Sequence, residues 1–247
     1  FGTDPSDISV SFNGTPAEFE LVDESTIVAT TPADYQTGSV TVTIHGYTMT
    51  GGAMFNPNSK GDVTVLYLQN YKQPFAKAND ESWKNGEWWT PAVWNQNAAS
   101  FNAKGNTTVS GMQYKSEEGL TLAFQNGWDK EAYTNGKMWQ VATLRPGKYR
   151  LEVTYAYTLV VTDAGNFISV LIAKGDSESD IPNVADLEQL NGVYVAYDKM
   201  GTANDSGTLV TPSFEVTETT DVVIGFLTSL AKGNSYFKVT ELKLILE

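Results

Sequence analysis

The sequence predicts an all-β protein, and three observations support this prediction. Apolar residues alternate with polar residues over several short stretches, which is the pattern of a half-buried β-strand. Five Asn-Gly pairs, led by Asn13, Asn85, Asn126, Asn135 and Asn191, favour tight turns because both residue types tolerate positive φ angles. Helical patterns are rare, and the best candidate is the short segment 181–190.

Four alternating segments give the expected strands in chain order. Their apolar residues are Ile8, Val10 and Phe12; Val40, Val42 and Ile44; Tyr149, Leu151, Val153, Tyr155 and Tyr157; and Phe237, Val239, Leu242, Leu244 and Leu246. Side chains two residues apart point to the same face of a strand. Each set is therefore expected to bury one face.

The composition changes between residues 51 and 62, where glycine, proline and small polar residues interrupt two strand-rich regions. We therefore expect two domains, residues 1–57 and 58–247. The first is short for a sandwich that stands alone, so it is expected either to pack on the second or to lack its opening strands. The second has room for about eight strands or more in a jelly roll.

Stretches of the first domain match most positions of four motifs that a known family has in this order: a G-x-x-F-G strand end, V-x-F-x-G-x-x-A, T-x-I-x-A-x-x-P and G-x-V-x-V-T-V. The matching positions are Phe1, Gly2, Val10, Phe12, Gly14, Ala17, Thr26, Ile27, Pro32, Gly38 and Val40 to Val42. By these positions the segment resembles the IPT/TIG immunoglobulin-like family. The family's opening strands would lie before Phe1, so part of the sheet edge is expected to be missing or exposed.

The second domain contains three stretches that follow a different family pattern, residues 144–158, 166–176 and 213–247. They resemble the galactose-binding-like jelly roll of carbohydrate-binding modules. An IPT/TIG module followed by such a domain resembles the outer-surface glycan-binding proteins of Sus-like polysaccharide-utilisation systems. The resemblance implies an outer membrane lipoprotein on the extracellular face of a bacterium, anchored through a segment before Phe1, with possible partner surface proteins.

Composition narrows the classes of partner. The chain has 16 basic and 29 acidic residues, and a formal charge of -13 repels nucleic acids and anionic membrane surfaces. There is no cysteine, which excludes disulfides, thiolate metal sites and a cysteine nucleophile. His45 is the single histidine and is expected to be an exposed or satisfied strand residue, so a histidine triad or a multi-histidine metal centre is excluded.

Four of the six tryptophans lie in the segment 83–94, among residues typical of turns. An exposed aromatic ring can stack on the C–H face of a sugar while nearby polar side chains bind its hydroxyls. A second segment, 126–139, has the same mixture of residues. The predicted ligand-binding residues are Trp83, Trp88, Trp89, Asn95, Asn97, Trp128, Asp129, Lys130 and Trp139.

The alternative for these tryptophans is a structural role. Pro91 fixes a turn, and Trp94 is expected to cover an open end of the sandwich core. The adjacent Trp88 and Trp89 point to opposite sides of an extended segment. We therefore expect one of them to pack and the other, with Trp83, to face solvent.

Catalysis has little support in the sequence. A glycosidase needs two carboxylates about 5 to 10 Å apart, and the dense acidic pairs are Glu117–Glu118 and Asp129/Glu131. The segment 235–239, SYFKV, is similar to a motif of jelly-roll polysaccharide lyases, but their arginine- and histidine-bearing strands are absent. We expect no catalytic residue and no cofactor, except for a possible structural calcium ion bound by Glu117, Glu118 and Glu241.

The sequence therefore predicts a non-catalytic protein that binds polysaccharide at a cell surface by aromatic stacking. Two alternatives remain open. One is a cell-adhesion or scaffold protein with protein partners, which an exposed apolar patch would favour. The other is a glycoside hydrolase or lyase, which needs two carboxylates that converge in a cleft.

Overall fold

The structure is a computed structural model that describes residues 4–56, 60–78, 88–101, 110–126, 132–160, 165–231 and 235–247. The described chain consists of β-strands with a few short helices, so the all-β prediction is confirmed. It divides into two compact units that meet in the sequence between Leu66 and Tyr67. No helix among the described residues is long and apolar enough to cross a membrane.

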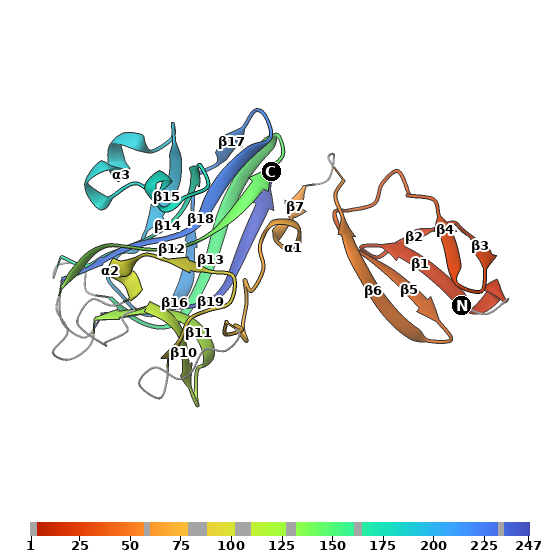
Figure 1. Cartoon of the computed structure of the whole chain (residues 1–247), viewed down its shortest axis with the longest axis horizontal. Helices are drawn as coiled ribbons and strands as arrows, with labels where there is room; N and C mark the ends of the chain where they lie inside the picture. The colour runs from red at the N-terminus through yellow and green to blue at the C-terminus, as the bar shows by residue number, and fades with distance from the viewer. Residues whose placement is uncertain are drawn as a thin grey trace. The chain divides into compact units, whose positions relative to one another are not determined.

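The first unit consists of a sheet and a separate hairpin (Figure 1). Its elements are η1 (Pro5–Asp7), β1 (Ile8–Phe12), β2 (Thr15–Ala17), β3 (Phe19–Asp23), β4 (Thr26–Ala29), β5 (Gly38–Ile44) and β6 (Tyr47–Met54), followed by β7 (Gly61–Asp62) and α1 (Thr64–Tyr67) at the junction. The sheet order is β2-β1-β5-β6, and β3 pairs with β4.

The core of the first unit forms around the apolar side of β1. Val10 and Phe12 are buried there as predicted, and the Phe12 ring meets the Tyr35 ring edge-on at 5.7 Å between centroids. The Tyr35 hydroxyl donates a hydrogen bond to the Phe55 carbonyl at 2.7 Å, so this buried polar group is satisfied.

Tight turns connect the strands of this unit. Asn13 and Gly14 have φ angles of 46° and 85°, which confirms the predicted Asn-Gly turn between β1 and β2. His45 and Gly46 form a similar turn between β5 and β6, with φ angles of 48° and 82°. His45 is therefore a turn residue rather than a strand residue, and its Nδ1 lies 3.0 Å from the exposed Asp7 carboxylate.

The second unit contains two antiparallel sheets. Its strands are β8 (Trp88–Trp89), β9 (Asn95–Gln96), β10 (Ser110–Lys115), β11 (Gly119–Asn126), β12 (Tyr133–Leu144), β13 (Gly147–Val160), β14 (Phe167–Lys174), β15 (Val195–Lys199), β16 (Ala203–Val210), β17 (Phe214–Val216), β18 (Thr220–Leu230) and β19 (Ser235–Leu246). The first sheet has the order β16-β13-β19-β11-β10-β8, with β17 beside β13, and the second has the order β15-β14-β18-β12-β9.

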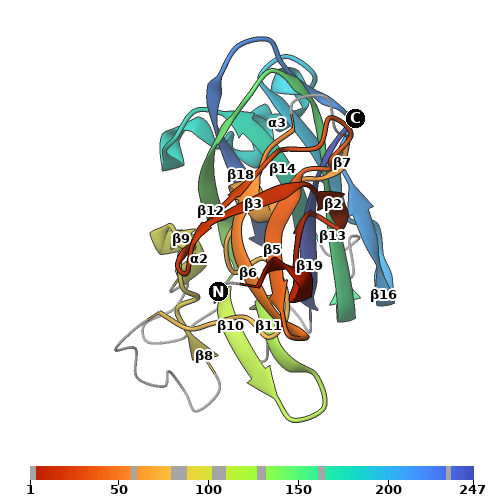
Figure 2. The same cartoon turned by 90° about the vertical axis from the view of Figure 1, so that its right-hand side faces the viewer.

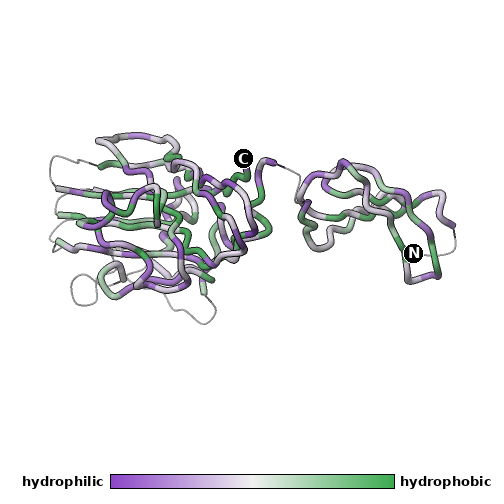
Figure 3. The backbone as a smooth tube through the Cα atoms, turned by 90° about the horizontal axis from the view of Figure 1, so that it is seen from above, coloured by the Kyte–Doolittle hydropathy of each residue, from purple (hydrophilic) through white to green (hydrophobic). Residues whose placement is uncertain are grey.

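Aromatic rings join the two sheets into a sandwich. Phe226 on β18 lies 4.9 Å from Phe124 on β11 and 6.3 Å from Phe237 on β19, measured between ring centroids. All three side chains are fully buried. Hydrophobic stretches run along the strands of this unit (Figure 3), and the predicted β-sandwich is confirmed.

Short helices lie outside the sheets. They are α2 (Ala98–Phe101), η3 (Glu178–Asp180) and α3 (Val184–Leu190). The helix predicted over residues 181–190 is thus confirmed, but it begins three residues later, after Pro182 and the extended N-cap Asn183. Leu187 buries its side chain in the core beneath it.

Alternation correctly predicts most of the long strands. Tyr149, Leu151 and Val153 on β13 are fully buried, as are the apolar positions of β19 from Phe237 to Leu244. The prediction fails at Tyr157, which is 48% exposed, because a register shift between Tyr155 and Thr158 interrupts the alternation. Asn135 also departs from its prediction, since it lies at an irregularity inside β12 rather than in a hairpin turn.

Candidate functional site

The described residues of the second unit include an open cleft of about 470 Å³ on the sheet that contains β13 and β19. Most of its lining residues come from β16, β13 and β19, which are neighbours in this sheet (Figure 2). The turn between β10 and β11 adds one more side chain. The lining residues are Glu118, Ala156, Tyr157, Thr158, Asp205, Ser206 and Tyr236.

Tyr157 reaches the cleft because β13 contains a bulge. Before the bulge, the buried positions of β13 are the odd-numbered Tyr149, Leu151 and Val153; after it, they are Thr158 and Val160. Tyr157 has a φ angle of 49°, in the left-handed region that a bulky residue rarely adopts. Bulges commonly re-aim a side chain, and this one exposes the Tyr157 ring.

Tyr155 stays on the core side of the bulge. Its ring centroid lies 5.6 Å from that of Phe237. Gly207 on β16 is paired with Tyr155, and a Cβ atom built at Gly207 would lie 2.5 Å from the Tyr155 hydroxyl oxygen. The absence of a side chain at Gly207 therefore allows Tyr155 to pack against β16.

On β19, Phe237 faces the core and the residues on either side of it, Tyr236 and Lys238, face the cleft side of the sheet. The Lys238 backbone N–H donates a hydrogen bond to Thr158 Oγ1 at 3.2 Å, which joins β19 to β13 next to the bulge. The Tyr236 ring is partly exposed. Two tyrosine rings are thus presented from adjacent, hydrogen-bonded strands.

A salt bridge lies beside these rings. Lys238 Nζ donates a hydrogen bond to Glu118 Oε2 and lies 5.4 Å from the centroid of the Tyr236 ring. The Lys238 and Glu118 side chains are 6% and 19% exposed, so the pair is largely withdrawn from solvent. Such pairing is the usual way to hold a buried cation, and it also fixes the position of Glu118.

The cleft therefore combines two kinds of group. The Tyr157 and Tyr236 rings supply flat apolar surface, while Asp205, Ser206 and Glu118 supply oxygen atoms that accept hydrogen bonds. Asp205 and Ser206 are exposed on β16. This arrangement suits a ligand that has an apolar face and several hydroxyl groups.

The predicted tryptophan platform is not found among the described residues. Trp88 and Trp89 are 3% and 7% exposed, so the expectation that one of them faces solvent is wrong. They form β8, which pairs with β10 through Gln113 and Met112. Both sides of this short strand are covered, and alternation therefore buries both rings instead of exposing one.

Trp94 packs on the core, as predicted. It is 5% exposed, and its ring centroid lies 5.7 Å from that of Phe226. The indole Nε1 donates a hydrogen bond to the Asn70 carbonyl at 3.0 Å. The ring therefore contributes to the interior of the sandwich, with its polar atom satisfied.

Trp139 and Asn97 also have structural environments, so the structure does not support them as ligand residues. Trp139 is 7% exposed and packs with Leu171 and Val223. Asn97 is 9% exposed; its Nδ2 donates to the Asn135 carbonyl and to Glu178 Oε1, and its Oδ1 accepts from Ser100 N and Lys137 N. The Asn97 amide therefore has no hydrogen bond left for a ligand, and the Trp139 ring has little accessible surface.

The structure does not decide the role of the other residues predicted to bind a ligand. Asn95 is exposed at the start of β9, where its Nδ2 lies 3.5 Å from the Trp139 carbonyl, so its binding role stays a prediction. Trp83, Trp128, Asp129 and Lys130 lie outside the described residues, as does Glu131.

The three glutamates predicted to bind calcium are not brought together. Glu118 is paired with Lys238, and Glu117 is exposed. Glu241 Oε2 lies 3.5 Å from Lys243 Nζ. Within the described ranges, no three Asp, Glu, His or Cys side chains form a group that could hold a metal ion. Calcium binding by other residues stays a prediction.

Sequence reasoning missed Tyr157, Tyr236, Asp205 and Ser206 as site residues. Tyr157 continues the alternation of β13, and nothing in the sequence reveals the bulge. Tyr236 lies in the SYFKV segment, which was a usable signal because that segment places an aromatic residue on each side of a strand. Asp205 and Ser206 carry no sequence signal of their own.

Comparison with known proteins identifies both parts of the chain. A family described as "Domain of unknown function (DUF5013)" matches residues 69–225, and the IPT/TIG domain matches residues 1–59. The predicted IPT/TIG resemblance is confirmed. No curated protein matches the chain.

Solved structures similar to this chain include carbohydrate-binding modules. TmCBM61 in complex with β-1,4-galactotriose has 11% identity and a TM-score of 0.37, over 69% of this chain and 97% of that chain. The xylan-binding module CBM15 has 14% identity and a TM-score of 0.34, over the same shares of 69% and 97%. The CBM22-1 xylan-binding domain of Paenibacillus barcinonensis Xyn10C has 10% identity and a TM-score of 0.34, also over 69% and 97%.

Proposed function

We propose a function for this chain, which belongs to the DUF5013 family, from the chemistry of its cleft: it binds carbohydrate between Tyr157 and Tyr236 and does not cleave it. The observation that carries the proposal is the pairing of two accessible tyrosine rings with exposed oxygen acceptors in one open cleft. Neither the tyrosine rings nor the oxygen acceptors alone indicate a particular ligand, but together they match the apolar face and the hydroxyl groups of a sugar ring.

The rings and the oxygen acceptors of the cleft suit different surfaces of a sugar. A pyranose ring has one face of C–H groups, which gains free energy when an aromatic ring covers it. Its hydroxyl groups need hydrogen-bond partners in return, and Asp205, Ser206 and Glu118 can accept these bonds. An open site buries little of its ligand, so modest affinity per sugar is expected, with contacts to several sugars of a chain.

Removing a tyrosine ring from the cleft tests this proposal. Tyr157→Ala and Tyr236→Ala are each expected to weaken binding by about 1 to 2 kcal/mol, or roughly 5- to 30-fold, because the stacking surface is lost. Isothermal titration against a panel of neutral polysaccharides, including galactan, xylan, glucan and mannan, measures the change. A panel without any bound member would contradict the proposal.

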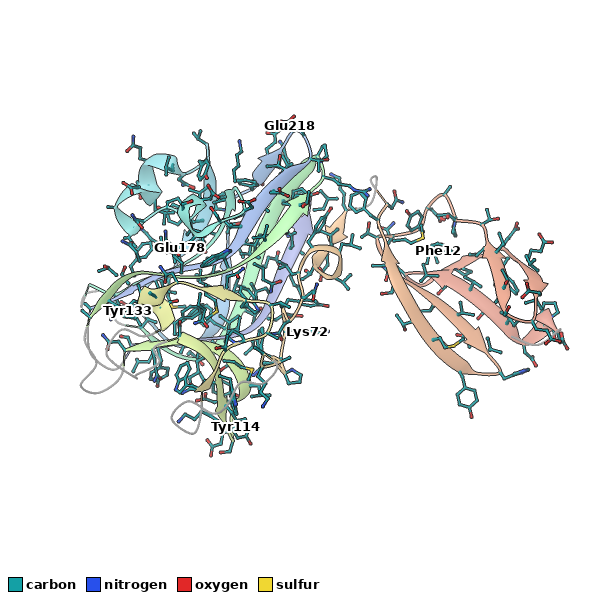
Figure 4. The ribbon with its side chains drawn as sticks, in the orientation of Figure 1. Phe12, Lys72, Tyr114, Tyr133, Glu178 and Glu218 are labelled. Atoms are coloured by element: carbon teal, nitrogen blue, oxygen red, sulfur yellow. The ribbon has the colours of Figure 1, made fainter. Side chains whose placement is uncertain are left out.

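The matched control is Tyr114→Ala. Tyr114 on β10 is 44% exposed, close to the exposure of Tyr157, but it does not line the cleft. It lies at the lower edge of the unit (Figure 4). Its removal is expected to leave affinity unchanged; equal losses in all three variants would show that the tyrosines act only through general stability.

The absence of cleavage is part of the proposal and has its own test. One cleft carboxylate, Glu118, is held by Lys238 in a salt bridge. A glycosidase would need that carboxylate and Asp205 to act as an acid–base or nucleophile pair. We expect no release of reducing ends or unsaturated products from any polysaccharide that binds; measurable release that Asp205→Asn abolishes would establish an enzyme instead.

We extend the proposal to the bacterial cell surface on the basis of the IPT/TIG and glycan-binding resemblance. Protease treatment of intact cells of the source organism is expected to remove the protein, whereas a cytosolic marker stays intact. Protection of the protein until the cells are lysed would contradict a surface location.

A second candidate function is adhesion to a protein, and one observation favours it. Tyr47 and Met49 on β6, two residues apart on the same face of an edge strand, are 80% and 51% exposed. Exposed edge strands with apolar side chains are typical contact sites. A Tyr47→Lys variant that keeps glycan binding but loses attachment to a protein-coated surface would support this second role.

A further inference from the structure

We infer that the cleft selects uncharged saccharides and disfavours glycans that carry uronate or sulfate groups. This inference rests on the proposed function and names its ligand class. It follows from the signs of the charges that surround the Tyr157 and Tyr236 rings, which neither the family description nor the aromatic chemistry specifies.

The titratable side chains of the cleft lining, apart from the tyrosines, are both acidic. Asp205 lies exposed on β16 at one side, and Glu118 reaches the cleft from the turn between β10 and β11 at the other. No lysine or arginine is among the lining residues. A ligand that stacks on the rings is therefore flanked by carboxylates from two directions.

The described cation that lies over the Tyr236 ring is already engaged. Lys238 is 6% exposed, and its Nζ is bound to Glu118 Oε2 and lies over the Tyr236 ring. Binding a ligand anion through Lys238 would require breaking this pair and would leave Glu118 without its counter-ion in a largely buried position. That exchange is costly because an unpaired buried charge is strongly disfavoured.

The same pair favours hydroxyl groups. Lys238 takes Oε2 of Glu118 and leaves Oε1 without a hydrogen-bond partner among the described residues. A carboxylate oxygen held in place in this way accepts a strong hydrogen bond from a neutral O–H donor. A ligand carboxylate or sulfate has no such hydrogen to donate and meets repulsion instead.

A charge-matched set of probes tests the inference. The probes are β-1,4-galactan, the same polymer with its primary hydroxyls oxidised to carboxylates, and the oxidised polymer after conversion of these carboxylates to neutral amides. We expect the oxidised form to bind about tenfold more weakly than the parent, or weaker still, at low ionic strength, because like charges at contact distance repel. The amide polymer should recover most of the affinity of the parent. Added salt should reduce the difference in affinity between the parent and the oxidised polymer.

If β-1,4-galactan itself does not bind, it is replaced by the neutral polysaccharide that binds most tightly in the panel described above. The anionic probe is then the same polysaccharide with some of its hydroxyls carboxymethylated. Equal or tighter binding of the anionic polymer, lost on Tyr157→Ala, would overturn the inference while leaving carbohydrate binding in place. Failure of every neutral and anionic glycan to bind would overturn the proposed function and the inference with it.

A pair of variants assigns the selectivity to the cleft. Asp205→Asn removes one cleft charge and is expected to reduce the ratio of neutral to anionic affinity by several-fold. Glu218→Gln makes the same change of net charge at an exposed loop position at the top of the unit (Figure 4), away from Tyr114 at the bottom and outside the cleft lining. The ratio of neutral to anionic affinity in Glu218→Gln should equal that of the unmodified protein. An unchanged ratio in Asp205→Asn, or an equal change in Glu218→Gln, would contradict a local electrostatic origin.

Discussion

At the residue scale, burial separates the aromatic side chains that hold the sandwich together from those that face the cleft. Four described tryptophans, Trp88, Trp89, Trp94 and Trp139, are each 7% exposed or less, whereas Tyr157 is 48% exposed. Large rings contribute most when they are fully removed from water. The tyrosines of the cleft keep an accessible face, which is what a ligand requires.

Replacing Trp94 by alanine is expected to destabilise the second unit by about 3 to 5 kcal/mol, because it leaves a cavity beside Phe226. Urea unfolding followed by circular dichroism measures the loss. The exposed Tyr114→Ala variant serves as the control and should change stability by only about 0.5 kcal/mol. A loss below about 1 kcal/mol for Trp94→Ala would mean that the site collapses around the missing ring.

The limits of sequence reasoning also appear at this scale. Alternation correctly identifies the buried face of β19, because two-residue periodicity follows directly from strand geometry. It cannot show that both rings of β8 are buried, since the strand beside β8, which is β10, comes from elsewhere in the chain. The tryptophan-rich segment therefore predicts an aromatic cluster correctly and its exposure incorrectly.

At the element scale, the loop after β14 shows how one carboxylate organises a turn. Asp180 Oδ2 accepts hydrogen bonds from the backbone N–H groups of Asp176 and Ser177, each at 3.0 Å, and from Ser177 Oγ at 2.6 Å. The hydrogen bond from the Ser177 hydroxyl, supported by the two backbone N–H groups, lowers the pKa of Asp180 below its usual 3.8. The carboxylate form is therefore stabilised in the folded state.

Asp180→Asn is expected to lower stability at pH 7 by about 1 kcal/mol, because the amide accepts these bonds more weakly. A carboxyl group with a depressed folded-state pKa stabilises the fold above its unfolded value of 3.8, and this contribution is lost as the pH falls through the folded value. The difference between the variant and the unmodified protein should therefore shrink as the pH falls below about 4. Thermal unfolding at pH 7 and pH 3 measures it.

Asp176→Asn is the matched control, since it removes the same charge from an exposed neighbour in the same loop. It should have little effect at either pH. If both variants lose the same stability, the effect reflects net charge rather than the hydrogen bonds of Asp180.

At the scale of the whole molecule, each unit has its own core. Phe12 and Tyr35 lie in the core of the first unit, and Phe226 lies in that of the second. All six tryptophans of the sequence come after residue 66, so tryptophan fluorescence reports on the second unit alone. The two cores can therefore be followed separately.

Phe12→Ala is expected to destabilise the first unit by about 3 to 5 kcal/mol, enough to unfold a small core. Tryptophan-detected urea unfolding should keep its midpoint, whereas the content of β-structure measured by circular dichroism should fall before that transition. Phe226→Ala changes the core of the second unit instead and should lower the tryptophan-detected midpoint. A shift of this midpoint in Phe12→Ala would show that the units do not unfold independently.

The bulge in β13 makes the cleft depend on the length of the chain as well as on its residue types. One extra residue between Tyr155 and Thr158 sets which side chains of the strand turn outward. Deleting Ala156 would leave Tyr157 opposite Ser206 in simple alternation, so Tyr157 and the residues that follow would keep their facing while the cleft loses Ala156 from its lining. Among relatives of this chain, a single-residue gap at this point would thus mark a strand without the bulge and without the left-handed backbone that Tyr157 adopts here.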